Sequence, residues 1–184
     1  SQCEITLEAN PGTVDSSYFE GYREAGVNRL SIGVQSLDNE RLKKIGRIHD
    51  AAEAIEAVSI AKSVGFEEIN CDLMFGLPDQ SLEEAISDLE GVLALEPTHL
   101  SHYQLTLEPN TYFYRYQPNL PDEELIEQMQ IESYARLAEA GFHHYEISAF
   151  AKRGSESRHN SNYWSFGDYV GIGAGAHGKI TMMS

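Results

Sequence analysis

The chain has 184 residues, with 13 lysines and arginines against 29 aspartates and glutamates, and so carries a formal net charge of −16. This length predicts a single domain whose core is large enough to fold without disulfides. The strong negative charge repels nucleic acid and anionic lipid, which argues against a nucleic-acid-binding protein.

Cys3 and Cys71 are the only cysteines, and no stretch has the pattern of a signal peptide or a transmembrane helix. Two isolated cysteines favour free thiols in a reducing, cytoplasmic compartment over a disulfide. The acidic residues are concentrated in segments with helical patterns, where we expect them on solvated faces.

Strand-like and helix-like segments alternate along the chain. Strands are predicted over residues 4–9, 29–36, 67–75, 99–107 and 144–150. Helices are predicted from Thr13 to Gly26 with Thr13 or Asp15 as N-cap, over 38–45, from Asp50 to Gly65, from a Ser81/Glu84 capping box to about Pro97, and from Asp122 to about Gly141. The segment 169–178, YVGIGAGAHG, is typical either of one more short strand or of a glycine-rich loop.

This alternation predicts an α/β fold, with right-handed crossovers and a parallel sheet whose helices lie on the outside. An open doubly wound sheet and a piece of a barrel both fit the pattern. No GxGxxG follows the first strand, which disfavours a dinucleotide-binding domain. Because the predicted strands are fewer than the eight of a complete barrel, we expect an incomplete (β/α) barrel.

Three predicted strands carry polar side chains that buried strands usually avoid. These residues are Glu8, Gln35 and Asp72. The carboxyl ends of parallel strands lie side by side, so the three side chains are expected to converge on one small-molecule site. Asp72 lies within an apolar strand and needs a partner, because an unpaired buried carboxylate is costly. Structural roles remain open for Glu8, which can accept backbone N–H bonds of the turn 10–12, and for Gln35, which can bridge strand ends.

The chain resembles the radical S-adenosylmethionine (SAM) family that contains oxygen-independent coproporphyrinogen III oxidase and the HemW-type haem chaperones. Three segments carry the resemblance: TLEANPGT, RLSIGVQSLDNERLKKIGRIHD and INCDLMFGLPDQS. The resemblance extends over nearly the whole chain, from the third strand of the family's partial (β/α)6 barrel onwards. It implies that Glu8, Gln35, Arg47 and Asp72 bind SAM.

The chemistry of SAM suits these residue types. Arg47 can bind its carboxylate, and the other three can share its ammonium and ribose hydroxyl donors. Pairing of Arg47 with Asp50, or capping of the short helix by Arg47, is the structural alternative.

A second motif contains the only tryptophan of the chain. It comprises His159, Asn160, Tyr163 and Trp164 and resembles the HNxxYW signature of the haem-chaperone branch, which implies haem contact. A neutral imidazole can bind haem iron, and aromatic rings offer flat surfaces to a porphyrin. The alternative is a loop in which His159 and Asn160 bond to the backbone while the two rings cover the barrel edge.

The resemblance also implies a [4Fe–4S] cluster held by a CxxxCxxC loop. Cys3 and Cys71 lie on separate predicted strands and do not form that loop. The cluster ligands and the family's glycine-rich motif are therefore expected upstream of Ser1, with no metal ligand in this chain. Residues 1–184 are expected to form one domain, the central and C-terminal part of a radical SAM core, and to be inactive alone.

Two further patterns carry weaker signals of function. Tyr103 to Pro109 ends a predicted strand and is expected beside the substrate, although such residues are also ordinary strand formers. His143 and His144 are adjacent on a predicted strand, point to opposite faces and are not expected to share a metal.

The resemblance implies a haem chaperone that delivers haem to acceptor proteins. The first alternative is the oxidase, which decarboxylates coproporphyrinogen III to protoporphyrinogen IX. The second is a non-radical α/β-barrel enzyme whose acidic strand ends bind a metal or a sugar. The expected partners are haem or a porphyrin and a haem-acceptor protein. The sequence leaves open whether the protein is an enzyme and which oligomeric state it has.

Overall fold

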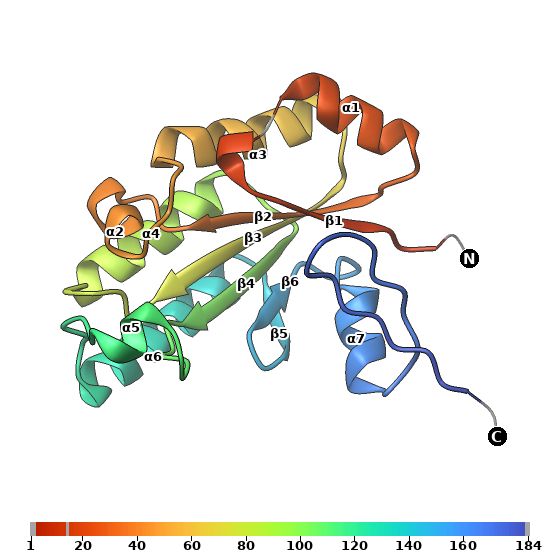
Figure 1. Ribbon diagram of the computed structural model, residues 1–184. Coiled ribbons are helices and arrows are strands. Elements are labelled where there is room, and N and C mark those ends of the chain that lie inside the picture. Colours follow the sequence, from red (N-terminus) through yellow and green to blue (C-terminus); the bar gives the residue numbers. More distant parts are fainter. Residues whose placement is uncertain (1–2, 14, 183–184) are drawn as a thin grey trace.

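One six-stranded sheet organises the molecule (Figure 1). The computed structural model describes residues 3–13 and 15–182. The strands lie in the order β1-β2-β3-β4-β6-β5. Their bounds are β1 Thr6–Ala9, β2 Arg29–Gln35, β3 Glu68–Phe75, β4 His99–Gln104, β5 His143–Glu146 and β6 Ala149–Ala151.

Helices connect the strands. They are α1 Ser16–Glu24, α2 Asn39–Lys44, α3 Ala51–Val64, α4 Leu82–Ala94, α5 Tyr112–Arg115, α6 Glu123–Glu139 and α7 Arg158–Trp164, with a 3₁₀ turn, η1, over Pro11–Thr13. The predicted starts of four helices are confirmed by their caps: Asp15, Asp50, Ser81 and Asp122 each accept a backbone N–H of the first turn. None of the described helices is long and apolar enough to span a bilayer.

The parallel sheet predicted from the sequence is confirmed for β1 to β4, which pair in parallel in chain order. The strand predicted over 144–150 is corrected to a hairpin, because the chain turns back at Ile147 and Ser148. As a result β6 runs antiparallel to β4 and β5 antiparallel to β6. The reversal places Phe150 in the core. The glycine-rich segment is a loop, closed by one bridge between Tyr169 and Lys179.

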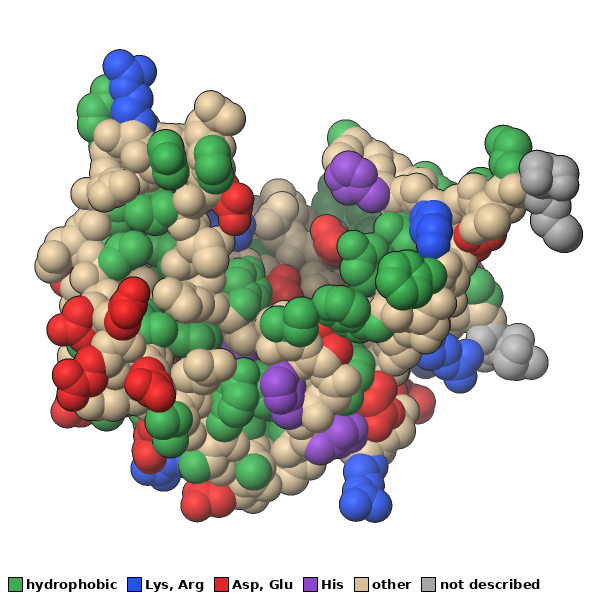
Figure 2. Space-filling view, turned by 90° about the horizontal axis from the view of Figure 1, so that it is seen from below, with side chains coloured by type: hydrophobic (Ala, Val, Ile, Leu, Met, Phe, Trp, Pro, Cys, Tyr) green, Lys and Arg blue, Asp and Glu red, His purple; other side chains and the backbone are tan. Residues whose placement is uncertain are grey.

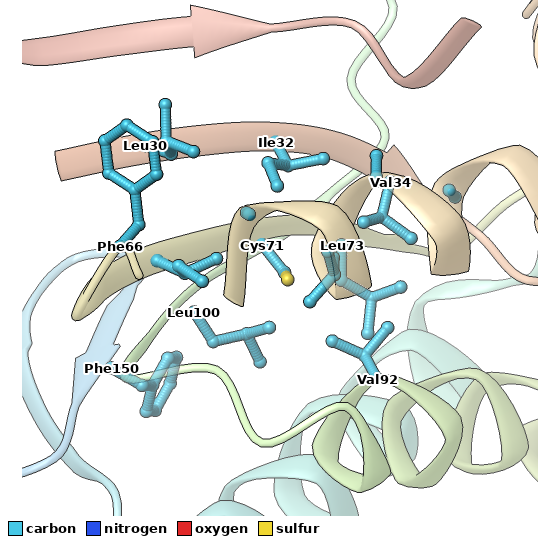
Figure 3. Packing of buried hydrophobic residues seen from close by; sticks show 14 of the residues in the cluster. Leu30, Ile32, Val34, Phe66, Cys71, Leu73, Val92, Leu100 and Phe150 are labelled. Atoms are coloured by element: carbon cyan, nitrogen blue, oxygen red, sulfur yellow. The ribbon is translucent and has the colours of Figure 1, made fainter. Parts of the chain in front are cut away.

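The core lies between one face of the sheet and helices α1, α3, α4 and α6. Every second residue of the central strands points into it, as the period-2 alternation of strands requires. Figure 3 shows this layer, which is formed by Leu30, Ile32, Val34, Phe66, Cys71, Leu73, Val92, Leu100 and Phe150. Cys71 is fully buried in this layer, and burial raises the pKa of its thiol to about 12. Its thiol is therefore protonated at neutral pH.

The opposite face of the sheet is polar. The residues that alternate with the core positions are Arg29 and Ser31 on β2, Glu68, Asn70 and Asp72 on β3, and His99, Ser101 and Tyr103 on β4. In Figure 1 the long helices lie on the other side of the sheet, and α7 and the C-terminal segment lie beside this face. Figure 2 shows a hollow between the helical body and the arm formed by the C-terminal segment, with charged side chains inside it. The sheet thus has an apolar outer face and a polar inner face.

Candidate functional site

The predicted residues Gln35 and Asp72 lie on the polar face around the ring of Tyr103. The Tyr103 hydroxyl donates to Gln35 Oε1 at 2.8 Å. Burial raises the pKa of Tyr103, the negative charge of Asp72 raises it further, and the positive charge of Arg47 opposes the shift. These influences require Asp72 and Arg47 to lie near the same hydroxyl, because Coulomb interactions weaken with distance.

Asp72 is held by hydrogen bonds from its own sheet. Asn70 Nδ2 donates to Asp72 Oδ1 at 2.8 Å, and Ser31 Oγ lies 3.5 Å from Asp72 Oδ2. Burial raises the pKa of Asp72, and the negative charge of Glu8 raises it further. The hydrogen bond from Asn70 lowers this pKa and so opposes both effects. Asp72 therefore has the partners that its sequence context required, but no cation pairs with it among the described residues. A ligand with ammonium or hydroxyl donors would favour its ionised form.

Local backbone geometry positions Gln35. The pairing of β2 with β3 shifts register between Ile32 and Gln35, and Gln35 has a φ of 68°. This left-handed conformation is uncommon for a residue other than glycine and is typical of functional sites. Gly33 leaves room for the Gln35 amide, because a Cβ at position 33 would lie 3.1 Å from Gln35 Nε2. Asp88 of α4 fixes the turn that follows: it accepts from Ser36 Oγ at 2.6 Å and from Leu37 N at 2.9 Å.

Glu8 and Arg47 have unoccupied hydrogen-bonding capacity. Glu8 is exposed at the end of β1, and within the described ranges its carboxylate accepts neither a hydrogen bond nor an ion pair. The alternative role for Glu8, bonding to the turn 10–12, is thus not seen. Arg47 lies between α2 and α3 and likewise has no ion pair with Asp50 in this part of the chain. The next turn is anchored by His49, whose Nε2 lies 3.2 Å from Val34 O. The site therefore offers a free carboxylate and a free guanidinium.

The motif over His159–Trp164 forms most of α7, and its side chains point in different directions. The exposed His159 ring packs edge-on against Tyr169, with centroids 4.7 Å apart, and its nitrogens make no hydrogen bond among the described residues. Tyr163 lies near the same Tyr169 ring. Trp164 Nε1 donates to Glu146 Oε2 at 3.1 Å. Asn160 instead hydrogen-bonds within the fold: its side-chain oxygen accepts from Ser157 Oγ, and its backbone N–H donates to the same Ser157 oxygen.

A cavity of about 350 Å³ lies between α7 and the β5–β6 turn. Its lining comprises Tyr145, Glu146, Ile147, Ser161 and Trp164. The ring of Trp164 and the exposed side chain of Ile147 make part of its wall apolar. The four motif residues are therefore not equivalent: Trp164 lines the cavity, His159 and Tyr163 lie against Tyr169, and Asn160 is bonded into the fold.

The sequence interpretation missed the residues that connect these two regions. Asn70, His99 and Tyr145 link Asp72 to the start of α7 by hydrogen bonds. The signal was present in the alternation of polar with apolar residues over 68–72 and 99–103, which is typical of a strand with one polar face. No short motif marked these residues.

The described residues do not form an iron–sulfur site. Cys71 faces the helices with a protonated thiol, Cys3 is exposed near the start of the chain, and both are free. Within the described ranges no group of three or more His, Cys, Asp or Glu side chains has a metal-binding arrangement. These residues therefore do not fit a [4Fe–4S] cluster, which requires thiolate ligands.

Comparison with known proteins identifies the class. The model of the radical SAM superfamily matches residues 1–90. The structure of coproporphyrinogen III oxidase (HemN) from Escherichia coli, described as a radical SAM enzyme, superimposes with a TM-score of 0.80 at 24% identity, covering 96% of this chain and 44% of that one. Residues 1–90 therefore carry a radical SAM domain, and the sheet with its outer helices is a partial barrel of that fold.

Sequence similarity points to a particular branch. The chain is 54% identical to the heme chaperone HemW of Escherichia coli (strain K12) over 181 residues, which is 98% of this chain and 48% of the relative. It is 44% identical to the mitochondrial radical S-adenosyl methionine domain-containing protein 1 of Bos taurus, over 96% of this chain and 41% of that protein. The chain thus spans about half the length of the curated relatives it matches.

Proposed function

We propose that this chain is the SAM-binding and haem-binding part of a HemW-like haem chaperone that acts in the cytoplasm and passes haem to acceptor proteins. The observation that carries the proposal is the placement of Gln35, Arg47 and Asp72 around Tyr103, with Glu8 on the Asp72 side, beside a helix that presents an unbonded imidazole. Similarity to HemW-type relatives over nearly the whole chain supports the same assignment.

SAM matches the free groups of the site. The guanidinium of Arg47 suits a carboxylate, for which its planar fork is well shaped. Glu8 and Asp72 are acceptors for an ammonium group and for ribose hydroxyls, and Gln35 can both donate and accept. When bound to an iron–sulfur cluster, SAM supplies radical chemistry. We infer that the cluster ligands belong to sequence outside these 184 residues, which agrees with the partial coverage of the relatives.

Haem is the proposed cargo at α7. The imidazole of His159 is available as an axial ligand because no other group engages its nitrogens in the described part of the chain. The apolar wall formed by Trp164 and Ile147 suits the edge of a flat macrocycle. In this proposal Asn160 holds the helix and does not touch the cargo.

Titrations with a protein extended to the full length of its relatives test the proposal. SAM binding measured by calorimetry is expected to weaken at least about tenfold in Arg47→Gln, the usual effect of losing a charge-assisted bond. The matched control is Arg153→Gln, which changes an exposed arginine and should bind SAM normally. Haem binding followed by the Soret band should be lost in His159→Ala and kept in His177→Ala.

Two results would contradict the proposal. Retention of the haem spectrum in His159→Ala would show that His159 is not the haem ligand. Decarboxylation of coproporphyrinogen III with no haem retention would identify the oxidase instead.

A further inference from the structure

A chain of hydrogen bonds crosses the polar face of the sheet from Asp72 to the start of α7. His99 lies at its centre: its Nδ1 is 2.6 Å from Asn70 Oδ1, and its Nε2 is 2.6 Å from the Tyr145 hydroxyl. Asn70 Nδ2 reaches Asp72 at one end, and Ser157 N donates to the Tyr145 oxygen at 3.1 Å at the other. The path joins three strands, β3, β4 and β5, to the N-cap of α7.

The neighbours of each side chain determine which atom donates in each hydrogen bond of this path. A carboxylate only accepts, so the Asn70 amide directs its nitrogen to Asp72 and its oxygen to His99. His99 Nδ1 must then carry the proton. Burial, helped by the positive charge of Arg29, lowers the pKa of His99 to about 3, so the ring is neutral and Nε2 accepts from the Tyr145 hydroxyl. The Tyr145 oxygen is left to accept from Ser157 N.

Burial makes these bonds costly to break. Asn70 and His99 are 5% and 2% exposed, and Tyr145 is half-buried. A buried polar group that loses its partner bears its full desolvation cost, and such networks rigidify what they join. The short helix α7 has no buried residue of its own, so its hydrogen bonds at the N-terminus, together with the bond from Trp164 to Glu146, hold it to the sheet. Besides Tyr145, the N-terminal bonds involve Glu4, which accepts from Arg158 N and His159 N.

We propose that Asn70, His99 and Tyr145 are positioning residues that couple the Asp72 end of the polar face to α7, with Ser157, the N-cap of α7, as the contact on the helix. A change at Asp72 alters how firmly α7 is held. Resting on the proposed function, this means that SAM and haem influence each other's affinity through the path, and by the same factor in both directions.

Hydrogen–deuterium exchange of the α7 amides tests the coupling without either ligand. In the full-length protein Tyr145→Phe keeps the ring but removes one link, and exchange over residues 158–164 should quicken about tenfold relative to the amides of α3 and α4. The matched control is Tyr134→Phe, which removes a hydroxyl from a tyrosine packed on Phe150 on the other face of the same sheet. It should leave α7 unchanged.

The remote link is tested in the same way. Asn70→Ala lies two bonds away from Tyr145 and should quicken α7 exchange several-fold. The control is Gln130→Ala, which removes an exposed side-chain amide that donates to Tyr134 on α6, away from the path, and it should leave α7 exchange unchanged. Equal quickening of α7, α3 and α4 in Asn70→Ala would mean general destabilisation and would overturn the proposal. Unchanged α7 exchange in either Tyr145→Phe or Asn70→Ala would also overturn it.

The ligand experiment separates this inference from the proposed function. Haem affinity is measured in the full-length wild type and in Tyr145→Phe, each with and without saturating SAM. A several-fold effect of SAM in the wild type that disappears in Tyr145→Phe supports the coupling, and an effect that persists in the variant contradicts it. Failure of the wild type to bind haem or SAM would overturn the proposed function, whereas the exchange experiments judge the hydrogen-bonded path on their own.

Discussion

Single residues on the polar face occupy environments that are unfavourable for stability. Asp72 is the clearest case, since burial raises the pKa of its carboxyl and no cation compensates its charge in the described part of the chain. Gln35 occupies a left-handed backbone conformation that costs about 1 kcal/mol or more. Unfavourable features of this kind persist at sites where a ligand benefits from them.

Asp72→Asn is therefore expected to stabilise the fold while it weakens SAM binding. The amide retains an acceptor for Asn70 and carries no buried charge, so the free energy of unfolding at pH 7 should rise by about 1 kcal/mol. In the wild type the unfolded carboxyl ionises near its ordinary pKa of about 3.9, and the folded one at higher pH. Wild-type stability thus falls as the pH rises through this window.

Urea denaturation at several pH values measures this effect. The advantage of Asp72→Asn should disappear below about pH 4, where the carboxyl is protonated in both states. Glu8→Gln, which changes an exposed carboxylate nearby, should give a much smaller gain. A variant less stable than the wild type at pH 7 would show that the hydrogen bonds of Asp72 outweigh its desolvation.

Helix α4 supports the candidate site through a side chain in its middle. The Asp88 side chain of α4 extends to the turn after β2 and holds Ser36 and Leu37, next to Gln35. Asp88→Ala would leave the Leu37 N–H without its acceptor, so we expect a loss of about 2 kcal/mol in the free energy of unfolding. It should also weaken SAM binding, because Gln35 is no longer held.

The control for this variant is Asp79→Ala, which removes an exposed carboxylate that binds Lys44 and Asn119. It should cost less than about 1 kcal/mol, as surface ion pairs do. Calorimetric SAM titration and urea denaturation of both variants distinguish them. Normal SAM affinity in Asp88→Ala would mean that Tyr103 alone holds Gln35 in place.

Local signals account for the elements that the sequence predicted correctly. The capping box at Ser81/Glu84 forms as expected, because it involves residues three positions apart, and a second box of the same spacing, Asp50/Glu53, begins the helix predicted from Asp50. The strands β1 to β4 follow apolar alternation. The hairpin after His143 was missed because its turn, at Ile147 and Ser148, contains neither glycine nor proline. The four-residue helix α5 was also missed, being too short for a periodic pattern.

The candidate site was only partly predictable, because local signals do not determine contacts between residues that are distant in sequence. Convergence of Glu8, Gln35 and Asp72 follows from a parallel sheet, so it could be expected from the order of strands. The path through His99 and Tyr145 depends on which strand lies beside β4, and that strand is β6 of the unforeseen hairpin. Contacts between residues distant in sequence are set by topology, on which a single sequence carries little information.

At the scale of the whole molecule, one buried arginine joins both ends of the chain. Arg29 is 3% exposed and binds Glu4 at 3.2 Å, Glu68 at 3.3 Å and the carbonyl oxygen of Ser155 at 2.9 Å. Glu4 in turn accepts backbone bonds from the start of α7. The segment before β1, the centre of the sheet and the segment before α7 therefore meet at a single guanidinium.

Arg29→Met should cost about 3 kcal/mol in the free energy of unfolding, because it leaves two carboxylates without their cation. The loss should be similar in 1 M salt, since buried charges are screened weakly. The control is Arg153→Met at an exposed position. If Arg29→Met had no more effect than this control, water would be solvating Glu4 and Glu68 in place of Arg29.

The position of Arg29 has a consequence for the order of folding. Its bonds to Glu4 and Glu68 close loops of a few tens of residues, whereas its bond to Ser155 spans 126 positions. Closing the longest loop has the largest entropic cost and is favourable only once the strands between are in place. We expect α7, with the candidate haem ligand His159, to dock late, onto a sheet that already presents Arg29 and His99. Helix α7 thus packs onto a sheet that has already formed, and it contributes little to the formation of that sheet.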